Sequence, residues 1–230
     1  MSRWLVHRTS ETMHVSSASA IVFAPHQDDE TFGCGGLIAL KRELGARVVI
    51  VFLTDGQGSH RTLRWSASQL VAIRKQEALA AAKHLGVPSE CVHFLGFPDS
   101  HLSSLSKPTR DQIIRSLASL IDHYMPEEIF IPHRHDQLAD HEATHALLRD
   151  SLRGAISPPK IFQYPIWLPW LAPLWLKLGS DDCRGALSLS IACVFDKKRL
   201  AIQAYQSQLE ILPDGFLSRY RVPFEVFFPS

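Results

Sequence analysis

The chain has 230 residues, of which 46% are hydrophobic and 20% charged, as in an ordinary globular protein. The 24 Lys and Arg nearly balance the 23 Asp and Glu, so the formal net charge is +1. This balance provides no field that would attract a polyanion, and we expect no nucleic-acid partner. The four cysteines form no CxxC pair, which indicates free thiols in a reducing cytoplasm.

No signal-peptide pattern and no run of about 20 apolar residues are present, so we expect no membrane-spanning segment. Residues 165–178 are nevertheless apolar and contain three tryptophans and three prolines. The prolines exclude a continuous helix. We interpret this segment as a loop or broken helix over the sheet, with an apolar lip for a lipid-linked substrate or a partner as the alternative. The expected location is cytoplasmic, with peripheral attachment to a membrane left open.

Apolar strands alternate with helices along most of the chain. We expect strands at residues 20–24, 47–54, 91–95, 128–131, 160–164, 187–195 and 222–228. We expect helices at residues 31–44, 66–85, 109–124, 140–153 and 196–210. Strands joined by helices predict right-handed crossovers and a mainly parallel sheet with helices on both faces. The prediction is a Rossmann-like three-layer α/β fold, as one domain over residues 1–230.

Ionisable side chains gather directly after the first strand. His26 is followed by Asp28, Asp29 and Glu30, and an apolar helix comes next. Capping of that helix accounts for one or two acids. It does not account for two adjacent aspartates and a histidine, because neighbouring carboxylates repel unless a cation lies beside them. The loop therefore predicts a divalent metal site formed by His26 and one of the aspartates.

A third ligand has to come from another loop at the same edge of the sheet, because a catalytic zinc site commonly has three protein ligands. The loop after the fourth strand contains six candidate ligands within thirteen residues: His133, His135, Asp136, Asp140, His141 and His145. His60 and Asp99 end two further loops at this edge and are candidates for substrate contact.

The segment Pro25-His26-Gln27-Asp28-Asp29-Glu30 resembles the PHxDDE signature of the LmbE-like, or PIG-L, N-deacetylases. Asp140 and His141 resemble the end of the second motif of that family, HxDH, and weaker matches extend the resemblance over about residues 20–210. The resemblance implies one divalent cation bound by His26, Asp29 and His141. Zinc is the first expectation and iron(II) the alternative.

The resemblance also implies roles beside the metal. Asp28 would be the general base that takes a proton from water, and Asp140 would assist catalysis from behind the ligands. Arg74 would hold polar groups of the substrate, unless it is an ordinary exposed arginine of a helix.

One position departs from the family pattern. Leu138 stands where HxDH begins with a histidine that helps to stabilise the oxyanion. Loss of such a donor typically costs about 10²–10³ in rate. Either His133 or His135 fills this role as a substrate-binding residue, or the metal acts alone, or the activity is weak.

The predicted function is removal of an N-acetyl group from an amino sugar such as N-acetylglucosamine, or from a lipid- or nucleotide-linked conjugate. One alternative is a metal-dependent phosphoesterase, which would need basic residues that are missing near the first loop before Lys41. The other is a weak or inactive family member that acts as a binding protein. Assembly into a homo-oligomer is left open.

Overall fold

The computed structural model describes residues 10–59, 64–168 and 185–230. Their strands form one eight-stranded sheet in the order β1-β7-β8-β6-β5-β2-β3-β4. The strands are β1 (Glu11–Thr12), β2 (Ala20–Ala24), β3 (Val48–Thr54), β4 (Val92–Phe97), β5 (Glu128–Pro132), β6 (Lys160–Tyr164), β7 (Leu187–Ser190) and β8 (Phe224–Pro229). Strand β8 is antiparallel to β6 and β7, and the other pairs are parallel. The expected mainly parallel, Rossmann-like sheet is confirmed.

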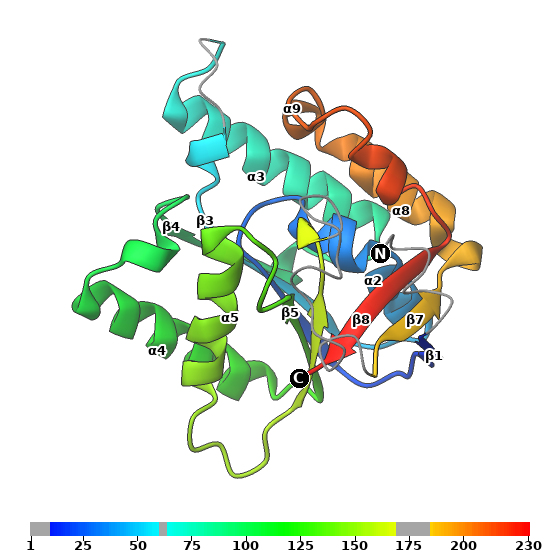
Figure 1. The fold of residues 1–230 in the computed structure, drawn as a ribbon, viewed down its shortest axis with the longest axis horizontal. Coiled ribbons are helices and arrows are strands. Elements are labelled where there is room, and N and C mark those ends of the chain that lie inside the picture. The colour runs from blue at the N-terminus through cyan, green and yellow to red at the C-terminus, as the bar shows by residue number, and fades with distance from the viewer. Residues whose placement is uncertain (1–9, 60–63, 169–184) are drawn as a thin grey trace.

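Helices cover both faces of this sheet (Figure 1). The α-helices are α2 (Asp29–Glu43), α3 (Ala67–His84), α4 (Lys107–Tyr124), α5 (Ala139–Ser151), α8 (Phe195–Ala204) and α9 (Gln206–Leu209). Short 3-10 turns are η1 (Gln57–Ser59), η2 (Ser89–Cys91), η3 (Leu102–Ser104), η5 (Ala192–Val194) and η6 (Leu217–Arg219). Helices α2, α3 and α8 pack in one hydrophobic core, and α4 and α5 pack in the other.

Alternate side chains of the central strands supply the two cores. Val48, Ile50 and Phe52 of β3 belong to the core under α2, while Val49 and Val51 face α4 and α5. Every residue of β3 is buried. A strand buried on both faces is apolar at every position, which is why the sequence pattern predicted this architecture.

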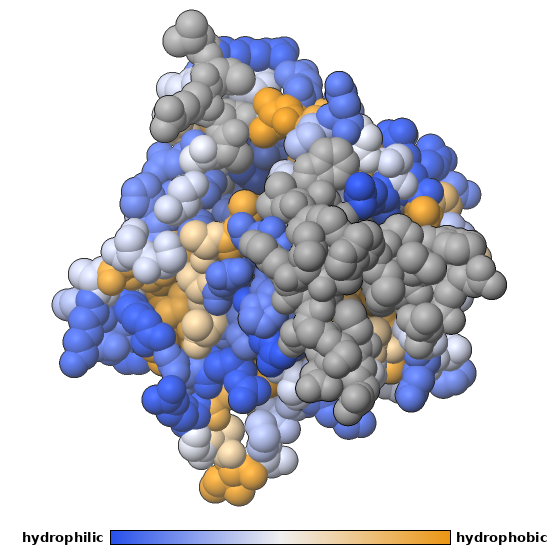
Figure 2. Space-filling model, in the orientation of Figure 1, coloured by the Kyte–Doolittle hydropathy of each residue, from blue (hydrophilic) through white to orange (hydrophobic). Residues whose placement is uncertain are grey.

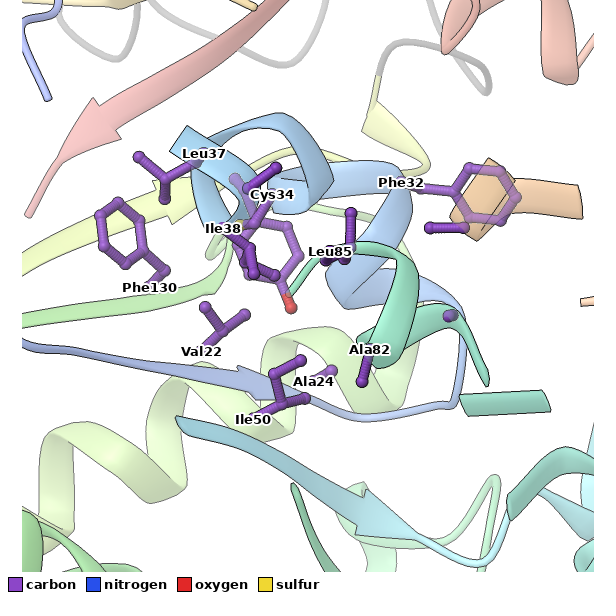
Figure 3. Packing of buried hydrophobic residues seen from close by; sticks show 14 of the residues in the cluster. Val22, Ala24, Phe32, Cys34, Leu37, Ile38, Ile50, Ala82, Leu85 and Phe130 are labelled. Carbon is purple, nitrogen blue, oxygen red and sulfur yellow. The ribbon is translucent and has the colours of Figure 1, made fainter. Parts of the chain in front are cut away.

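Helix α2 lies close against the sheet because it contains glycines where side chains would collide. Figure 3 shows Leu37 and Ile38 of α2 packed among Val22 and Phe130 of the sheet. A Cβ atom on Gly33 would lie 2.2 Å from Cδ2 of Tyr164. This close packing holds the start of α2, and the polar turn before it, in place against β2.

The structure differs from the sequence-based boundaries in the last third of the described chain. The helix expected at 196–210 is two helices, α8 and α9, because Tyr205 between them leaves the helical conformation (ψ 54°). The strand expected at 187–195 ends at Ser190. Ile191 has ψ 19° and leads into η5, so that pairing with β8 stops there.

The topology brings four polar loops to one edge of the sheet. Strands β4, β3, β2, β5 and β6 are neighbours in that order and run parallel, and the chain changes direction along the sheet between β4 and β5. A crevice at such a switch point, beyond the carboxyl ends of the strands, is where open α/β sheets bind ligands. The loops after β2 and β5, which carry the predicted metal ligands, meet there.

The surface visible in Figure 2 is mostly hydrophilic where it is coloured, with separate small hydrophobic patches. Among the described helices, none has the length and apolarity needed to cross a bilayer.

Of the apolar segment at 165–178, residues 165–168 are described and residues 169–178 lie outside the described part. His60 also lies outside it.

Candidate active site

Three predicted ligands lie together at the switch point. His26 Nδ1 is 3.2 Å from Asp29 Oδ2, and the same oxygen is 3.3 Å from Nε2 of His141. The three ligand atoms all lie within 4.8 Å of one another. His26 and Asp29 come from the turn between β2 and α2, whereas His141 lies in the first turn of α5. The fold therefore joins residues that are 115 positions apart in the chain.

The environment of His141 fits a bound cation. Its Nδ1 is 2.7 Å from Oδ2 of Asp136, whose Oδ1 accepts the backbone N–H groups of Ile166 and Leu168. A carboxylate accepts hydrogen bonds, so Nδ1 of His141 carries the hydrogen and Nε2 presents a lone pair. Within the described residues this buried Nε2 has no hydrogen-bond partner. A lone pair beside the Asp29 carboxylate is favourable only with a cation between them.

Two of the predicted ligands, His26 and Asp29, have pKa values that differ from their usual ones. Burial by itself would lower the pKa of His26, but hydrogen bonds to Asp140, Asp29 and Asp99 raise it well above the usual value. Burial would raise the pKa of Asp29, yet His141 and His26, when they are protonated, hold it below its usual value through their positive charges. The cluster therefore favours an ionised carboxylate at the place where a cation would bind.

Behind His26 lie two carboxylates that orient its ring. His26 Nε2 is 3.2 Å from Asp99 Oδ1 and 3.3 Å from Asp140 Oδ2. Asp140 also accepts the backbone N–H groups of Ser100 and Leu102. It thereby ties the loop after β4 to the start of α5. A carboxylate on the second nitrogen of a ligand histidine sets the direction of the first nitrogen, which here faces Asp29.

Asp28 is the remaining carboxylate beside the predicted ligands. Burial and the charge of Asp29 raise its pKa well above the usual value, and Arg74 opposes this shift. The distance between Arg74 Nη2 and Asp28 Oδ1 is 3.8 Å. A raised carboxyl pKa near a cleft is typical of a group that exchanges protons.

Arg74 is buried, so the alternative of an exposed helical arginine is excluded. Its Nη1 donates to the carbonyl of Gly56 and its Nη2 to the carbonyl of Gln27, both at 2.9 Å. It therefore joins the loops after β2 and β3 as well as facing Asp28. Gly56 has φ +74°, and a Cβ atom there would lie 2.2 Å from Gln27 Oε1, so a glycine is needed at this junction.

These residues open into a cavity of about 280 Å³. The described residues that line it are His26, Asp28, Asp29, Phe32, Arg74, Asp99, Ser100, Leu138, Ile166, Trp167, Gln208, Ile211, Leu212, Pro213 and Phe216. Leu138 lies at the N-cap of α5 and lines this cavity, so the departure from HxDH falls inside the site.

His133 and His135 lie elsewhere. His133 is buried with its ring 4.9 Å from that of Phe228, and its Nδ1 accepts the backbone N–H of His135. His135 is exposed, and neither histidine is among the described residues lining the cavity. The loop after β5 thus directs His141, and not these two residues, to the site.

The contacts that Asp99 and Asp136 make in the site were not predicted from the sequence. Asp99 was only a candidate for substrate contact, and Asp136 was one of several candidate ligands. Asp99 comes two residues after the end of β4 at the active edge, which was the available signal. Nothing in the spacing of Asp136 and His141 indicated that they would form a hydrogen bond.

Comparisons with known proteins identify the family of this chain. Residues 21–152 match the family model of the GlcNAc-PI de-N-acetylases, PIG-L. A 4-oxalmesaconate hydratase of Pseudomonas putida is 27% identical over 212 residues, which cover 87% of this chain and 78% of the relative.

Among solved structures, the conserved protein TT1542 of Thermus thermophilus is 27% identical with a TM-score of 0.64, covering 88% of this chain and 84% of that one. The N,N'-diacetylchitobiose deacetylase of Pyrococcus horikoshii is 23% identical with a TM-score of 0.62, covering 87% and 73%. Because the family match spans more than half of the residues and includes the metal-site turn and the His141 helix, the chain belongs to the PIG-L, or LmbE-like, family.

Proposed function

We propose that this chain is a metal-dependent hydrolase that removes an N-acetyl group from an amino sugar or a glycoconjugate. The observation that carries the proposal is the position of Asp28, a carboxylate next to Asp29 in the chain that faces Arg74 at 3.8 Å and lines the same cavity as His26 and Asp29. This is the arrangement that activation of a water molecule requires. Membership of a family described as de-N-acetylases supports the amide as the bond that is cleaved.

The roles follow from the contacts. A divalent cation held by His26, Asp29 and His141, with zinc as the first choice and iron(II) as the second, supplies Lewis-acid chemistry when bound. Asp28 takes a proton from the attacking water and returns it to the departing nitrogen. Asp140 keeps the ring of His26 oriented and acts as a positioning residue.

The walls of the cavity suggest the kind of conjugate. The described lining residues include the polar Arg74 and Ser100 and the apolar Leu138, Trp167 and Phe216. The rings of Trp167 and Phe216 lie 4.8 Å apart and form an aromatic wall. Such a wall fits a sugar face or an alkyl group. A lipid-linked conjugate is favoured over a nucleotide-linked one, because Arg74 is the one lysine or arginine among the described lining residues.

The hydratase relative supports a second candidate function, addition of water to an unsaturated acid. Leu138 favours the same alternative, because a site without the usual histidine has one donor fewer for the oxyanion of an amide. Addition of water would still use Asp28 and the cation but would release no amine. The products of the reaction therefore distinguish the two candidates.

The experiment compares two preparations of the purified protein. One is stripped of metal by a chelator, and the other is stripped and then reloaded with Zn²⁺ or Fe²⁺. Substrates are N-acetylglucosamine, its octyl glycoside, a sugar phosphate and an unsaturated dicarboxylic acid, and the readouts are acetate, free amine, phosphate and hydrated acid. We expect acetate and amine in equal amounts, only with metal. Asp28→Asn should retain the metal and lose about 10²–10⁴ in rate. The exposed Asp122→Asn is the matched control.

Other outcomes would replace the proposal. Bound metal without turnover of any amide would indicate a binding protein, and hydrated acid without amine would indicate a hydratase. Release of phosphate from a sugar phosphate would indicate a phosphoesterase. Wild-type rates in Asp28→Asn would show that another group is the base.

A further inference from the structure

The backbone of Asp28 is held in a conformation that L-residues rarely adopt. Its φ is 142° and its ψ is −27°, although it is not a glycine. Its carbonyl accepts the N–H groups of Thr31 and Phe32 at the start of α2, while its side chain makes no capping hydrogen bond. Strained residues of this kind persist only where the surroundings fix them, and they concentrate at functional sites.

Glu30 supplies the contact that fixes this conformation. Its Oε2 accepts the backbone N–H of Asp28 at 3.1 Å. Its Oε1 accepts the hydroxyl of Thr31 at 2.5 Å and the hydroxyl of Tyr205 at 2.6 Å. Glu30 is fully buried and is not among the described residues lining the cavity. It therefore lies behind Asp28, between the turn that carries the metal ligands and the last part of the chain.

The hydroxyl of Tyr205 contacts Glu30 from the break between helices α8 and α9. Tyr205 is fully buried and lies between α8 and α9, with φ −84° and ψ 54°. Two residues after it, Ser207 donates through its backbone N–H and its hydroxyl to Glu77 of α3, both at 2.7 Å. This second contact anchors α9 on α3. The hydroxyl of Tyr205 is thus held at a defined position, 175 residues along the chain from its acceptor.

We propose that Tyr205 is a positioning residue that acts through Glu30 to hold Asp28 beside the metal ligands. This inference rests on the proposed function of Asp28 as the base. Arg74 faces the carboxylate of Asp28 and Glu30 holds its backbone N–H, so Asp28 is restrained at both ends. Loss of the Tyr205 hydroxyl leaves Glu30 with one donor fewer and free to turn away from Asp28. Misplacement of a catalytic group by about 1 Å can cost about 10²-fold in rate.

The test is Tyr205→Phe in the full-length, zinc-loaded protein, since this change removes only the hydroxyl. We expect kcat to fall by about 10- to 100-fold, with KM and metal affinity within about twofold of wild type. In the Asp28→Asn background the same change should have no further effect, because residues that act as one unit are not additive. The matched control is Tyr124→Phe, which removes another hydrogen-bonded hydroxyl, one that lies 2.7 Å from Nε2 of His93 at the last residue of α4. Its kcat should stay at the wild-type value.

A crystal structure of metal-bound Tyr205→Phe gives a readout that does not depend on activity. We expect Asp28 to leave its positive φ and its contact with Glu30. An unchanged Asp28 together with an unchanged kcat would overturn the inference, as would an equal loss of kcat in Tyr124→Phe or in the Asp28→Asn background. If the wild type cleaves no amide, the proposed function fails, and the position of Asp28 in the two crystal structures still decides whether Tyr205 holds it.

Discussion

The carboxylate of Asp136 lies 2.7 Å from Nδ1 of His141, and both side chains are fully buried. Asp136 also accepts two backbone N–H groups, so all of its partners are donors. Asp136→Asn replaces one acceptor oxygen with an NH₂ group, which can only donate. Whichever way the amide turns, this NH₂ group faces either Nδ1–H of His141 or the two backbone N–H groups, so donors are left opposed. We expect metal affinity to fall by about 10- to 100-fold. Titration against a chelator of known affinity measures this change.

The exposed Asp122 provides the control for that substitution. Asp122→Asn makes the same chemical change outside the site and should leave metal affinity unchanged. Equal affinity in Asp136→Asn and wild type would mean that Asp136 does not set the orientation of His141.

Leu138→His restores the histidine that the family motif carries at this position. Leu138 lines the cavity, so a new ring there has access to the substrate. If the natural site lacks an oxyanion donor, we expect kcat to rise by about tenfold or more, because each such donor is typically worth about 10²–10³. Steady-state kinetics on the best amide substrate measure it, with Leu138→Met as the apolar control. A kcat at or below that of wild type would argue that the site does not need this donor.

Gly33→Ala tests the close contact between α2 and the sheet. Alanine normally stabilises a helix interior by about 1 kcal/mol relative to glycine. Here its Cβ would lie 2.2 Å from a ring carbon of Tyr164, which is fully buried and has no space to move. We expect a net loss of about 1–3 kcal/mol in the free energy of unfolding, measured with urea.

Gly35→Ala is the comparison for this prediction. Its Cβ would come no closer than 3.2 Å, to a methylene group of Lys198, so it should cost less stability. A Gly33→Ala protein as stable as wild type would contradict the packing described for α2.

His145 makes stability depend on pH. Burial, followed by the charges of Arg149 and Arg134, lowers the pKa of His145 to about 4. The unfolded chain binds this proton near pH 6.5, so protonation favours the unfolded state, and stability is lost as the pH falls from about 6.5 towards 4. His145→Leu removes this loss. Relative to wild type, it should gain about 1 kcal/mol between pH 7.5 and pH 5, after allowance for solvent screening.

Urea unfolding of both proteins across this pH range, in a chelator, measures the difference without a contribution from metal binding. A difference that does not vary with pH would show that His145 titrates normally in the folded protein.

Much of the fold was predictable because strands buried on both faces leave a clear pattern. The uniformly apolar run of β3 predicted both the strand and the helices that cover it. The helix expected at residues 66–85 is present as α3, and the side chain of Ser66 accepts the N–H of Gln69 at its start. The break at Tyr205 was not predictable, since its conformation accompanies a hydrogen bond to Glu30, far away in the chain.

The chain by itself determined the polar turn after the first predicted strand, the parallel sheet and the family, because these depend on residue types at short spacings along one strand, turn or helix. Only the tertiary structure decided that Asp136 supports His141, that Arg74 is buried, and that His133 is not among the described residues lining the cavity. Such contacts join loops that meet only after the sheet is assembled. Their geometry depends on how entire helices pack against the sheet, and a local pattern of residues does not determine that packing.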